Sequence, residues 1–355
     1  MTVADAAPDL AGILSLDAFE PLARLALDRA SYDYIAGGSW DELSLASSVE
    51  AWRRRTLRPR VLVDVAAVTT ATTLLGRVSA MPVAIAPMAI HGAAHPDGEV
   101  ATARAAAAAG VPFTLSTMSS RSIEEVAAAA PDATLWFQLY VQADPGRTRR
   151  LVERAGAAGY RAIVVTVDLP VLGYRERDRR NAFELPSLGN FADDVGEFGL
   201  EEDWLTRSLT WADLATIRSW APGLPLVLKG ILTAEDARLA VEHGADAIVV
   251  SSHGARQLDR VPATVDVLEE IVDAVRGRTE IWVDGGVRRG LDVTVALALG
   301  ARGVLLGRPA LYALAAGGQA GVERVLAILR EELEIALALL GTPSPADVTR
   351  AHLGA

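Results

Sequence analysis

The chain has 355 residues and a net charge of −11, and 51% of its residues are hydrophobic. This length is compatible with one large α/β barrel, and the apolar fraction is sufficient for a sizeable core. The acidic balance argues against a nucleic-acid partner because no basic excess is present to neutralise phosphates, and the absence of cysteine excludes disulfides and thiolate chemistry.

The segment 1–80 precedes the regular part of the pattern. We expect it to form helices and a short hairpin that close the bottom of the fold. Its opening stretch, Met1 to Leu16, lacks a basic segment and a long apolar run, so no signal peptide is expected. No window reaches about 18 uninterrupted apolar residues, so we expect no membrane span and a cytoplasmic protein.

Eight short apolar runs, bounded by Gly, Pro or polar residues, have the pattern of buried strands. These runs are residues 83–86, 113–116, 135–138, 162–167, 226–229, 247–251, 281–284 and 303–307. Most are separated by segments with helical periodicity, namely 98–109, 122–129, 148–158, 234–243, 265–275 and 289–299. Apolar strands that alternate with helices predict a parallel sheet, and eight units predict a closed (β/α)8 TIM barrel. We place this barrel at about residues 81–320 of a single domain, 1–355.

Several residues mark the ends of the predicted helices. Ser122, followed by Glu125 three residues later, is a capping-box pattern. Four glycines follow alanine-rich last turns or helix ends and are candidate C-caps: Gly110, Gly159, Gly244 and Gly300. A last helix is expected at residues 322–340.

The connection between the fourth and fifth strands, residues 168–225, is much longer than the others. Its excess, residues 184–211, mixes glycine, proline, acidic and aromatic residues, among them Phe191, Phe198 and Trp204. Long irregular insertions of this kind are typical of active-site lids.

In (β/α)8 barrels the active site lies at the C-terminal ends of the strands. Polar side chains stand at or after at least six of these ends: Ser116, Gln138, Tyr140, Thr166, Asp168, Lys229, Ser251, His253, Arg256, Asp284, Arg288 and Arg308. Lys229 is the only lysine among 34 basic residues. This gathering predicts a functional site at the rim.

His253 follows the sixth strand and is the candidate general base. Asp284 stands one strand over, and a carboxylate beside an imidazole stabilises its protonated form. Arg256 is placed to clamp a carboxylate. The alternative is a structural histidine at a strand end. His91, His95 and His243 have no spacing that makes a metal site and are interpreted as structural, so no metal is expected.

The loops after strands seven and eight carry Gly286, Arg288, Gly307 and Arg308. Barrels often bind phosphate there through glycine-rich backbone amides and arginine side chains. The alternative interpretation is turn glycines with solvated arginines. Both loops together favour a phosphorylated cofactor or substrate.

The run Ser-His-Gly-Ala-Arg-Gln-Leu-Asp at 252–259 resembles the signature of the FMN-dependent 2-hydroxy-acid oxidases and dehydrogenases. Agreement extends over nearly the whole chain, at residues 32–34, 37–38, 58–60, 85–87, 95–99, 138–140, 166–168 and 284–290. The resemblance is closest to the glycolate oxidase type of this family.

The resemblance implies bound FMN. Its phosphate would be held by Gly286, Arg288, Gly307 and Arg308. Around the ring system it implies hydrogen bonds from Ser116, Gln138 and Thr166, the backbone of Pro87, Met88 and Ala89, and further contacts from Ser251 and Asp284. Lys229 would stabilise the negative charge of the reduced ring.

For the substrate, the resemblance implies that Arg175 and Arg256, assisted by Tyr34, bind the carboxylate. Tyr140 would reach the hydroxyl or the carboxylate. His253 would take a proton, and Asp284 would stabilise the resulting imidazolium. Whether that proton comes from the hydroxyl or from the α-carbon stays open.

Departures from the glycolate oxidase pattern concern substrate size. Met88 replaces a smaller polar residue, and Met118 replaces a tryptophan over the substrate side chain, with Leu172 on the same wall. A flexible methionine should open an apolar pocket, so we expect a larger aliphatic or aryl (S)-2-hydroxy acid. The alternative is that Trp204 refills the space.

We expect oxygen as the electron acceptor, reduced to hydrogen peroxide. Membrane-bound mandelate dehydrogenases of the family carry an apolar segment where this chain is acidic, at residues 186–208, with Asp193, Asp194, Glu197, Glu201, Glu202 and Asp203. The alternative is a soluble dehydrogenase that uses a quinone or cytochrome. An FMN-dependent isomerase and a catalytically dead scaffold fit the rim less well. The family also implies a homo-oligomer, a tetramer or an octamer.

Overall fold

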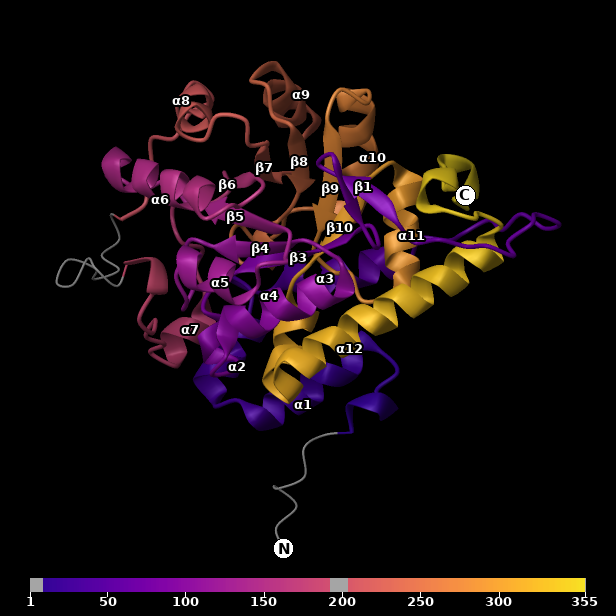
Figure 1. The fold of residues 1–355 in the computed structure, drawn as a ribbon, viewed down its shortest axis with the longest axis horizontal. Coiled ribbons are helices and arrows are strands. Elements are labelled where there is room, and N and C mark those ends of the chain that lie inside the picture. The colour runs from indigo at the N-terminus through magenta and orange to yellow at the C-terminus, as the bar shows by residue number, and fades with distance from the viewer. Residues whose placement is uncertain (1–8, 192–203, 355) are drawn as a thin grey trace, which may run out of the picture.

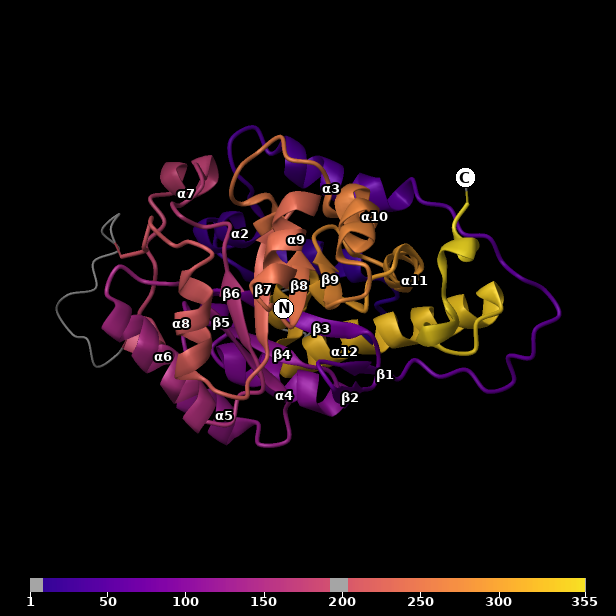
Figure 2. The same cartoon turned by 90° about the horizontal axis from the view of Figure 1, so that it is seen from above.

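The computed structural model describes residues 9–191 and 204–354. Eight parallel strands close into a barrel in the order β10-β3-β4-β5-β6-β7-β8-β9, and helices surround it (Figures 1 and 2). The strands are β3 (Val83–Met88), β4 (Phe113–Ser116), β5 (Leu135–Leu139), β6 (Ile163–Thr166), β7 (Leu226–Ile231), β8 (Ala247–Val250), β9 (Glu280–Asp284) and β10 (Gly303–Leu306). All eight predicted strands are confirmed. β3 and β7 extend past their predicted ends, and each contains a register shift in that extension.

The barrel helices also follow the predicted pattern. They are α4 (Gly98–Ala109), α5 (Ile123–Ala129), α6 (Pro145–Ala157), α9 (Ala234–Glu242), α10 (Thr264–Val275) and α11 (Gly290–Leu299). The Ser122 and Glu125 capping box is present at the start of α5. Gly110 and Gly300 are left-handed C-caps, and Gly159 and Gly244 have positive φ just beyond their helix ends. The long connection adds two further helices, α7 (Glu176–Arg180) and α8 (Asp213–Trp220).

The last helix is longer than predicted. α12 (Arg308–Leu340) starts directly after β10 and changes direction at Gly317 and Gly318, where the backbone leaves helical angles. The prediction found only residues 322–340 because this glycine pair interrupts the helical pattern. The segment before the break begins at the strand end that carries Arg308, and α12 crosses α4 and α1 (Figure 1).

The described part of the segment 1–80 divides between the two ends of the barrel. A hairpin of β1 (Thr72–Leu74) and β2 (Arg77–Ser79) closes the bottom, where Leu74 packs into the interior cluster and Leu75 N donates to Glu280 at the start of β9. α1 (Phe19–Ala26), α2 (Arg29–Ala36) and α3 (Leu43–Arg53) complete this part. The expectation that all of it lies at the bottom is wrong for α2, whose Tyr34 and Ile35 line the cavity at the opposite end.

α2 is held at the C-terminal rim of the barrel by hydrogen bonds from two arginines to the carbonyls at its C-terminal end. The last carbonyls of a helix have no intrahelical partner. Arg256 donates to Tyr34 O at 2.5 Å and to Gly37 O at 3.1 Å. Arg308 donates to Ile35 O at 3.0 Å and to Gly37 O at 2.7 Å. Two rim arginines therefore fix the C-terminal end of α2 over the barrel mouth.

The barrel interior is filled by side chains. Ala84, Trp136, Val164, Val227, Val249, Trp282 and Leu305 are buried there. The rings of Trp136 and Trp282 meet edge to face with centroids 5.2 Å apart, a favourable aromatic geometry. A filled interior leaves the C-terminal rim as the end at which a ligand can enter.

Candidate active site

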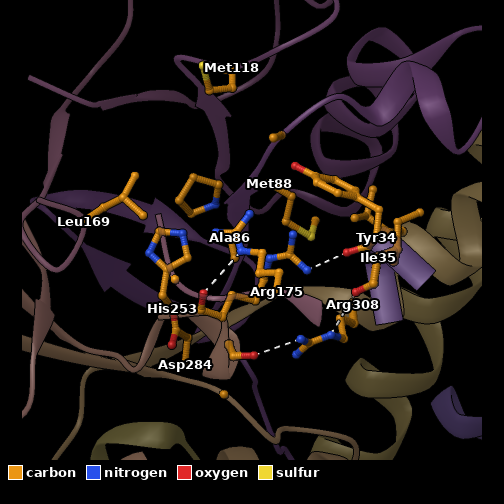
Figure 3. A pocket seen from close by; sticks show the side chains of 18 of the residues that line it. Tyr34, Ile35, Ala86, Met88, Met118, Leu169, Arg175, His253, Asp284 and Arg308 are labelled. Carbon is orange, nitrogen blue, oxygen red and sulfur yellow. Dashed lines mark hydrogen bonds between the residues drawn. The ribbon is translucent and has the colours of Figure 1, made fainter. Parts of the chain in front are cut away.

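A cavity of about 520 Å³ opens at the C-terminal ends of the strands. The predicted site residues that line it are Tyr34, Pro87, Met88, Ala89, Met118, Tyr140, Leu172, Arg175, Lys229, His253, Arg256, Asp284, Gly286, Arg288, Gly307 and Arg308. Figure 3 shows how several of them face a common space, with His253 and Asp284 on one side and Arg308 and Tyr34 on the other. The volume suits a cofactor or drug-sized ligand.

His253 is joined to a carboxylate and to a phenol. Its Nδ1 lies 2.9 Å from Asp168 Oδ1, and its Nε2 lies 3.2 Å from the Tyr140 hydroxyl. An ionised carboxylate can only accept a hydrogen bond, so Nδ1 carries the proton, and the Nε2 lone pair accepts the hydrogen bond of the Tyr140 hydroxyl. The backbone of His253 has a positive φ of 57°, and its N–H donates to Ser251 Oγ at 3.1 Å. Backbone strain of this kind is common at functional sites.

The electrostatics of this group favour a neutral imidazole beside a charged carboxylate. Burial lowers the pKa of His253 below its ordinary 6.5, and Asp168 offsets this only in part. Burial raises the pKa of Asp168, but the charge and hydrogen bond of His253 and the charge of Lys229 outweigh it, so that pKa is lowered. Burial, helped by the charge of Asp168, raises the pKa of Tyr140. At neutral pH the site therefore holds a base at His253 Nε2 and a hydroxyl donor at Tyr140.

The expected contact between His253 and Asp284 is wrong. Asp284 instead faces Lys229, with Nζ and Oδ2 3.3 Å apart, and both side chains are buried. Lys229 Nζ also donates to Ser251 Oγ at 2.9 Å. Inward-facing residues of a (β/α)8 barrel form layers from alternate strands. Lys229 of β7 and Asp284 of β9 therefore lie in one layer. Asp168, which follows β6, and His253, which follows β8, lie in another.

Arg175 and Arg256 form a cationic pair in the cavity wall. Arg175 donates to Arg256 O at 3.2 Å and to Gln257 Oε1 at 3.4 Å. Burial, with the charge of Arg256, lowers the pKa of Arg175 to about 10. The Arg256 guanidinium stands 4.7 Å from the Tyr34 ring centre, and its Nη2 is buried without a hydrogen-bond partner. In the described ranges the nearest carboxylate to Arg256 is that of Asp178 at 3.9 Å. The pair is suited to an anionic ligand.

The opposite end of the cavity has the features of a phosphate site. Arg308 donates to three backbone carbonyls, those of Ile35, Gly37 and Gly254. Burial lowers the pKa of Arg308 to about 10, and no described carboxylate lies within ion-pair distance of it. A partly buried guanidinium without an acidic partner favours binding of an anion. Arg288 and the backbone of Gly286 and Gly307 line the same end, so the residues present fit the predicted FMN phosphate.

Four predicted ring contacts, Ser116, Gln138, Thr166 and Ser251, are not among the residues that line the cavity. Ser116 Oγ donates to Gln138 Oε1 at 3.0 Å, and Gln138 Nε2 donates to Thr166 Oγ1 at 2.9 Å. Ser251 connects Lys229 and His253 through the hydrogen bonds given above. All four side chains are buried. Ser116, Gln138 and Thr166 therefore form one hydrogen-bonded chain at adjacent strand ends, and Thr166 lies level with Lys229 in the strand register.

The wall expected to face the substrate side chain is apolar. Met118 is only 5% exposed, and Leu172 stands at the mouth with 55% exposure. Trp204 lines the same cavity and meets the Tyr140 ring edge to face at 6.0 Å. Residues 192–203 of the predicted lid, with all six of the acidic residues noted above, lie outside the described residues.

Two residues of the site were missed by sequence reasoning. Asp168 was noted only as a strand-end residue, although the alternation Val164, Thr166, Asp168 puts it on the inward face. Gln257 donates to Asp168 O at 3.0 Å and to Val171 O at 2.8 Å, and it accepts from Gly173 N at 3.1 Å. It therefore ties the loop after β6 to the loop after β8, a role that no local pattern indicates.

Comparison with known proteins shows what this arrangement is related to. A family model described as FMN-dependent dehydrogenase matches residues 23–355. The chain belongs to the FMN-dependent dehydrogenase family. Within this family it is 49% identical to glycolate oxidase 3 of Oryza sativa subsp. indica over 354 residues, which covers 96% of each chain. It is 48% identical to an L-lactate oxidase of Nostoc sp., with 96% of this chain and 98% of the relative covered.

Solved structures of the family agree in fold. The crystal structure of a mandelate oxidase superposes with a TM-score of 0.90 at 46% identity, covering 96% of this chain and 98% of the other. FMN is therefore the cofactor of this family member, and the resemblance stated from the motifs is confirmed.

Within the described ranges, no group of three or more acidic or histidine side chains is arranged to hold a metal ion. No helix in those ranges combines the length and apolar character needed to cross a membrane.

Proposed function

We propose that the protein oxidises an (S)-2-hydroxy acid to the 2-oxo acid and reduces oxygen to hydrogen peroxide. The observation that carries this proposal is the unprotonated Nε2 of His253, 3.2 Å from the Tyr140 hydroxyl and in the same cavity as the Arg175 and Arg256 pair. A base beside a carboxylate-binding pair is what removal of a proton from a bound 2-hydroxy acid requires. The relatives named as glycolate, L-lactate and mandelate oxidases support it.

The residues divide the work as follows. Arg175 and Arg256, with Tyr34, bind the substrate carboxylate, and Tyr140 donates a hydrogen bond to its hydroxyl or carboxylate. His253 Nε2 accepts one proton, and Asp168 stabilises the imidazolium that forms. FMN, when bound in this cavity, would supply the two-electron redox chemistry that couples oxidation of the substrate to reduction of oxygen. Lys229, held by Asp284 and Ser251, supplies a fixed positive charge at the cavity floor.

The remaining cofactor roles are proposed as the motifs implied them. Gly286, Arg288, Gly307 and Arg308 hold the phosphate. The backbone of Pro87, Met88 and Ala89 would pack behind the ring system. Hydrogen bonds to the ring would come from Ser116, Gln138 and Thr166, with a further contact from Ser251. Asp284 is proposed to act through Lys229, not through His253.

The pH dependence of kcat/KM should follow the protonation of the His253 imidazole. Its pKa is lowered from 6.5 by burial, so the neutral, proton-accepting form is present at pH 7 and is lost only as the pH falls through that lowered pKa. We expect kcat/KM to decrease on the acid side with a midpoint below 6.5. Steady-state rates from pH 4 to 9 check this, and an acid limb centred above 7 would contradict it.

We propose a larger aliphatic or aryl substrate because Met118 leaves an apolar wall. Two solved mandelate oxidase structures, one with (S)-mandelic acid and one with benzoyl-formic acid, show that family members accommodate aryl acids. Met118→Trp should reduce kcat/KM for mandelate by about 10–200-fold relative to glycolate, since a filled pocket rejects the larger side chain. A panel of glycolate, lactate, a long-chain 2-hydroxy acid and mandelate measures this shift. If the variant keeps the wild-type ranking, Trp204 sets the pocket size instead.

Oxygen as acceptor is tested by peroxide. Enzyme and substrate mixed in air should give one hydrogen peroxide for each 2-oxo acid formed. Turnover that needs an added dye, quinone or cytochrome would show the dehydrogenase alternative instead.

We also keep three predictions that rest on the sequence and the family: one domain over residues 1–355, a homo-oligomer and a cytoplasmic location. Size-exclusion chromatography with light scattering tests the oligomer.

A further inference from the structure

The side chain of Asp168, which contacts His253, packs against Gly230, a residue that has no role in the proposal so far. Gly230 lies in β7 next to the segment after β6, where Val167 N donates to Lys229 O at 2.9 Å. A Cβ placed on Gly230 would stand 2.6 Å from Asp168 Cγ, 2.7 Å from its Cβ and 3.0 Å from its backbone N. These atoms belong to the stem and backbone of Asp168, so a side-chain rotation could not relieve the contact.

The backbone at Gly230 is irregular as well. Its φ is +117°, and the register between β7 and β8 shifts between Lys229 and Ile231. A bulge of this kind bends a strand and redirects its side chains, and it is frequent next to active sites. Here Lys229, just before the bulge, points inward to Asp284 and Ser251, and the bulged residue itself faces Asp168.

Asp168 is held in place from other directions. Gln257 donates to its carbonyl at 3.0 Å. Within the described part of the chain, the Asp168 carboxylate has one hydrogen-bond partner from another side chain, His253, and its Oδ2 is buried without one. The groups that act on His253 are Asp168, Tyr140, Lys229 and Arg175. Among these, Asp168 is the one whose atoms a Cβ at Gly230 would meet.

We propose that Gly230 is a positioning residue for the reaction: its bulge and missing side chain leave the space in which the Asp168 carboxylate stands against His253. This inference rests on the proposed function of His253 as the base. An alanine at this position would displace Asp168 and leave the imidazole without its counter-charge.

The test is Gly230→Ala combined with Asp168→Asn in a double-mutant cycle. Gly230→Ala should lower kcat by a factor similar to that of Asp168→Asn, about 10²–10⁴. In the Asp168→Asn background it should cost at most a few-fold more, because the charge it would displace is already gone. The proposal would be overturned if the losses of kcat in the two single variants multiplied in the double variant, or if Gly230→Ala alone had wild-type kcat.

Gly223→Ala is the matched control. Gly223 also has positive φ, +84°, but no atom lies within 4 Å of an added Cβ, so it reports backbone strain without the contact. If Gly230→Ala fails to retain FMN, the double variant Gly230→Ala, Asp168→Gly should recover part of the lost thermal stability and FMN binding, because it removes the contacts with Asp168 Cβ and Cγ and leaves only the one with the backbone N. No recovery would contradict the contact.

A readout independent of turnover separates this inference from the proposed function. The chain has five histidines, so ¹³C-histidine NMR can follow His253, assigned by its loss in His253→Gln. Gly230→Ala should lower the titration midpoint of His253 in the same direction as Asp168→Asn. If wild type oxidises no 2-hydroxy acid yet this shift occurs, the function is wrong and the positioning stands. Turnover with an unshifted midpoint leaves the function and rejects the positioning.

Discussion

His253→Gln is expected to fold, to retain FMN and to lose turnover by about 10²–10⁴-fold. Glutamine approximates the size of the imidazole and can still contact Tyr140 and Asp168, but it cannot accept a proton near neutral pH. Anaerobic stopped-flow mixing with substrate measures the loss as slower bleaching of the flavin absorbance.

A histidine outside the site provides the control for this variant. His243 stacks on Trp211 with ring centres 5.6 Å apart and does not line the cavity, so His243→Gln should bleach at the wild-type rate. Bleaching of His253→Gln at that rate would remove His253 from the role of base.

Asp168→Asn should also reduce kcat by about 10²–10⁴-fold, because the neutral amide no longer stabilises the imidazolium. The acid limb of the kcat/KM profile should move to lower pH, since the carboxylate is what raises the pKa of His253 against the effect of burial. Steady-state kinetics over pH and the visible spectrum of the bound flavin give both quantities.

Asp284→Asn is the comparison that distinguishes the role of the Asp284 carboxylate from that of Asp168. It breaks the buried pair with Lys229, and removing one partner of such a pair typically costs about 3–5 kcal/mol. We therefore expect lower thermal stability and weaker FMN retention, with a smaller effect on the proton-transfer step. If Asp284→Asn shifts the His253 limb and Asp168→Asn does not, the sequence-based pairing is right and the structural one is wrong.

The architecture could be predicted because it depends on repetition. Each strand is a continuous apolar run, and each helix has its own periodicity and caps, as at Ser122 and Gly300. These signals are local, and eight of them determine a closed barrel whose rim residues can be listed in advance. Lys229, His253, Asp284 and Arg308 in the cavity lining were predicted for this reason, whereas Tyr34, Arg175, Met118 and Leu172 were implied by the family resemblance.

The pairing within the site could not be predicted in the same way. Sequence reasoning chose Asp284 for His253 because β9 is next to β8, but inward side chains of alternate strands share a layer. Asp168 is therefore hydrogen-bonded to His253 across β7, and Lys229 forms an ion pair with Asp284. The position of α2 was missed for another reason: its attachment depends on bonds from Arg256 and Arg308, which lie in the distant C-terminal part of the chain and leave no local signal near α2.

An anaerobic titration of the wild-type enzyme, followed by readmission of air, tests the central claim most directly. The account predicts that one equivalent of an (S)-2-hydroxy acid bleaches the flavin completely and yields one equivalent of the 2-oxo acid. Air should then restore the colour and produce one equivalent of hydrogen peroxide. A flavin that no member of the 2-hydroxy-acid panel bleaches would contradict the account.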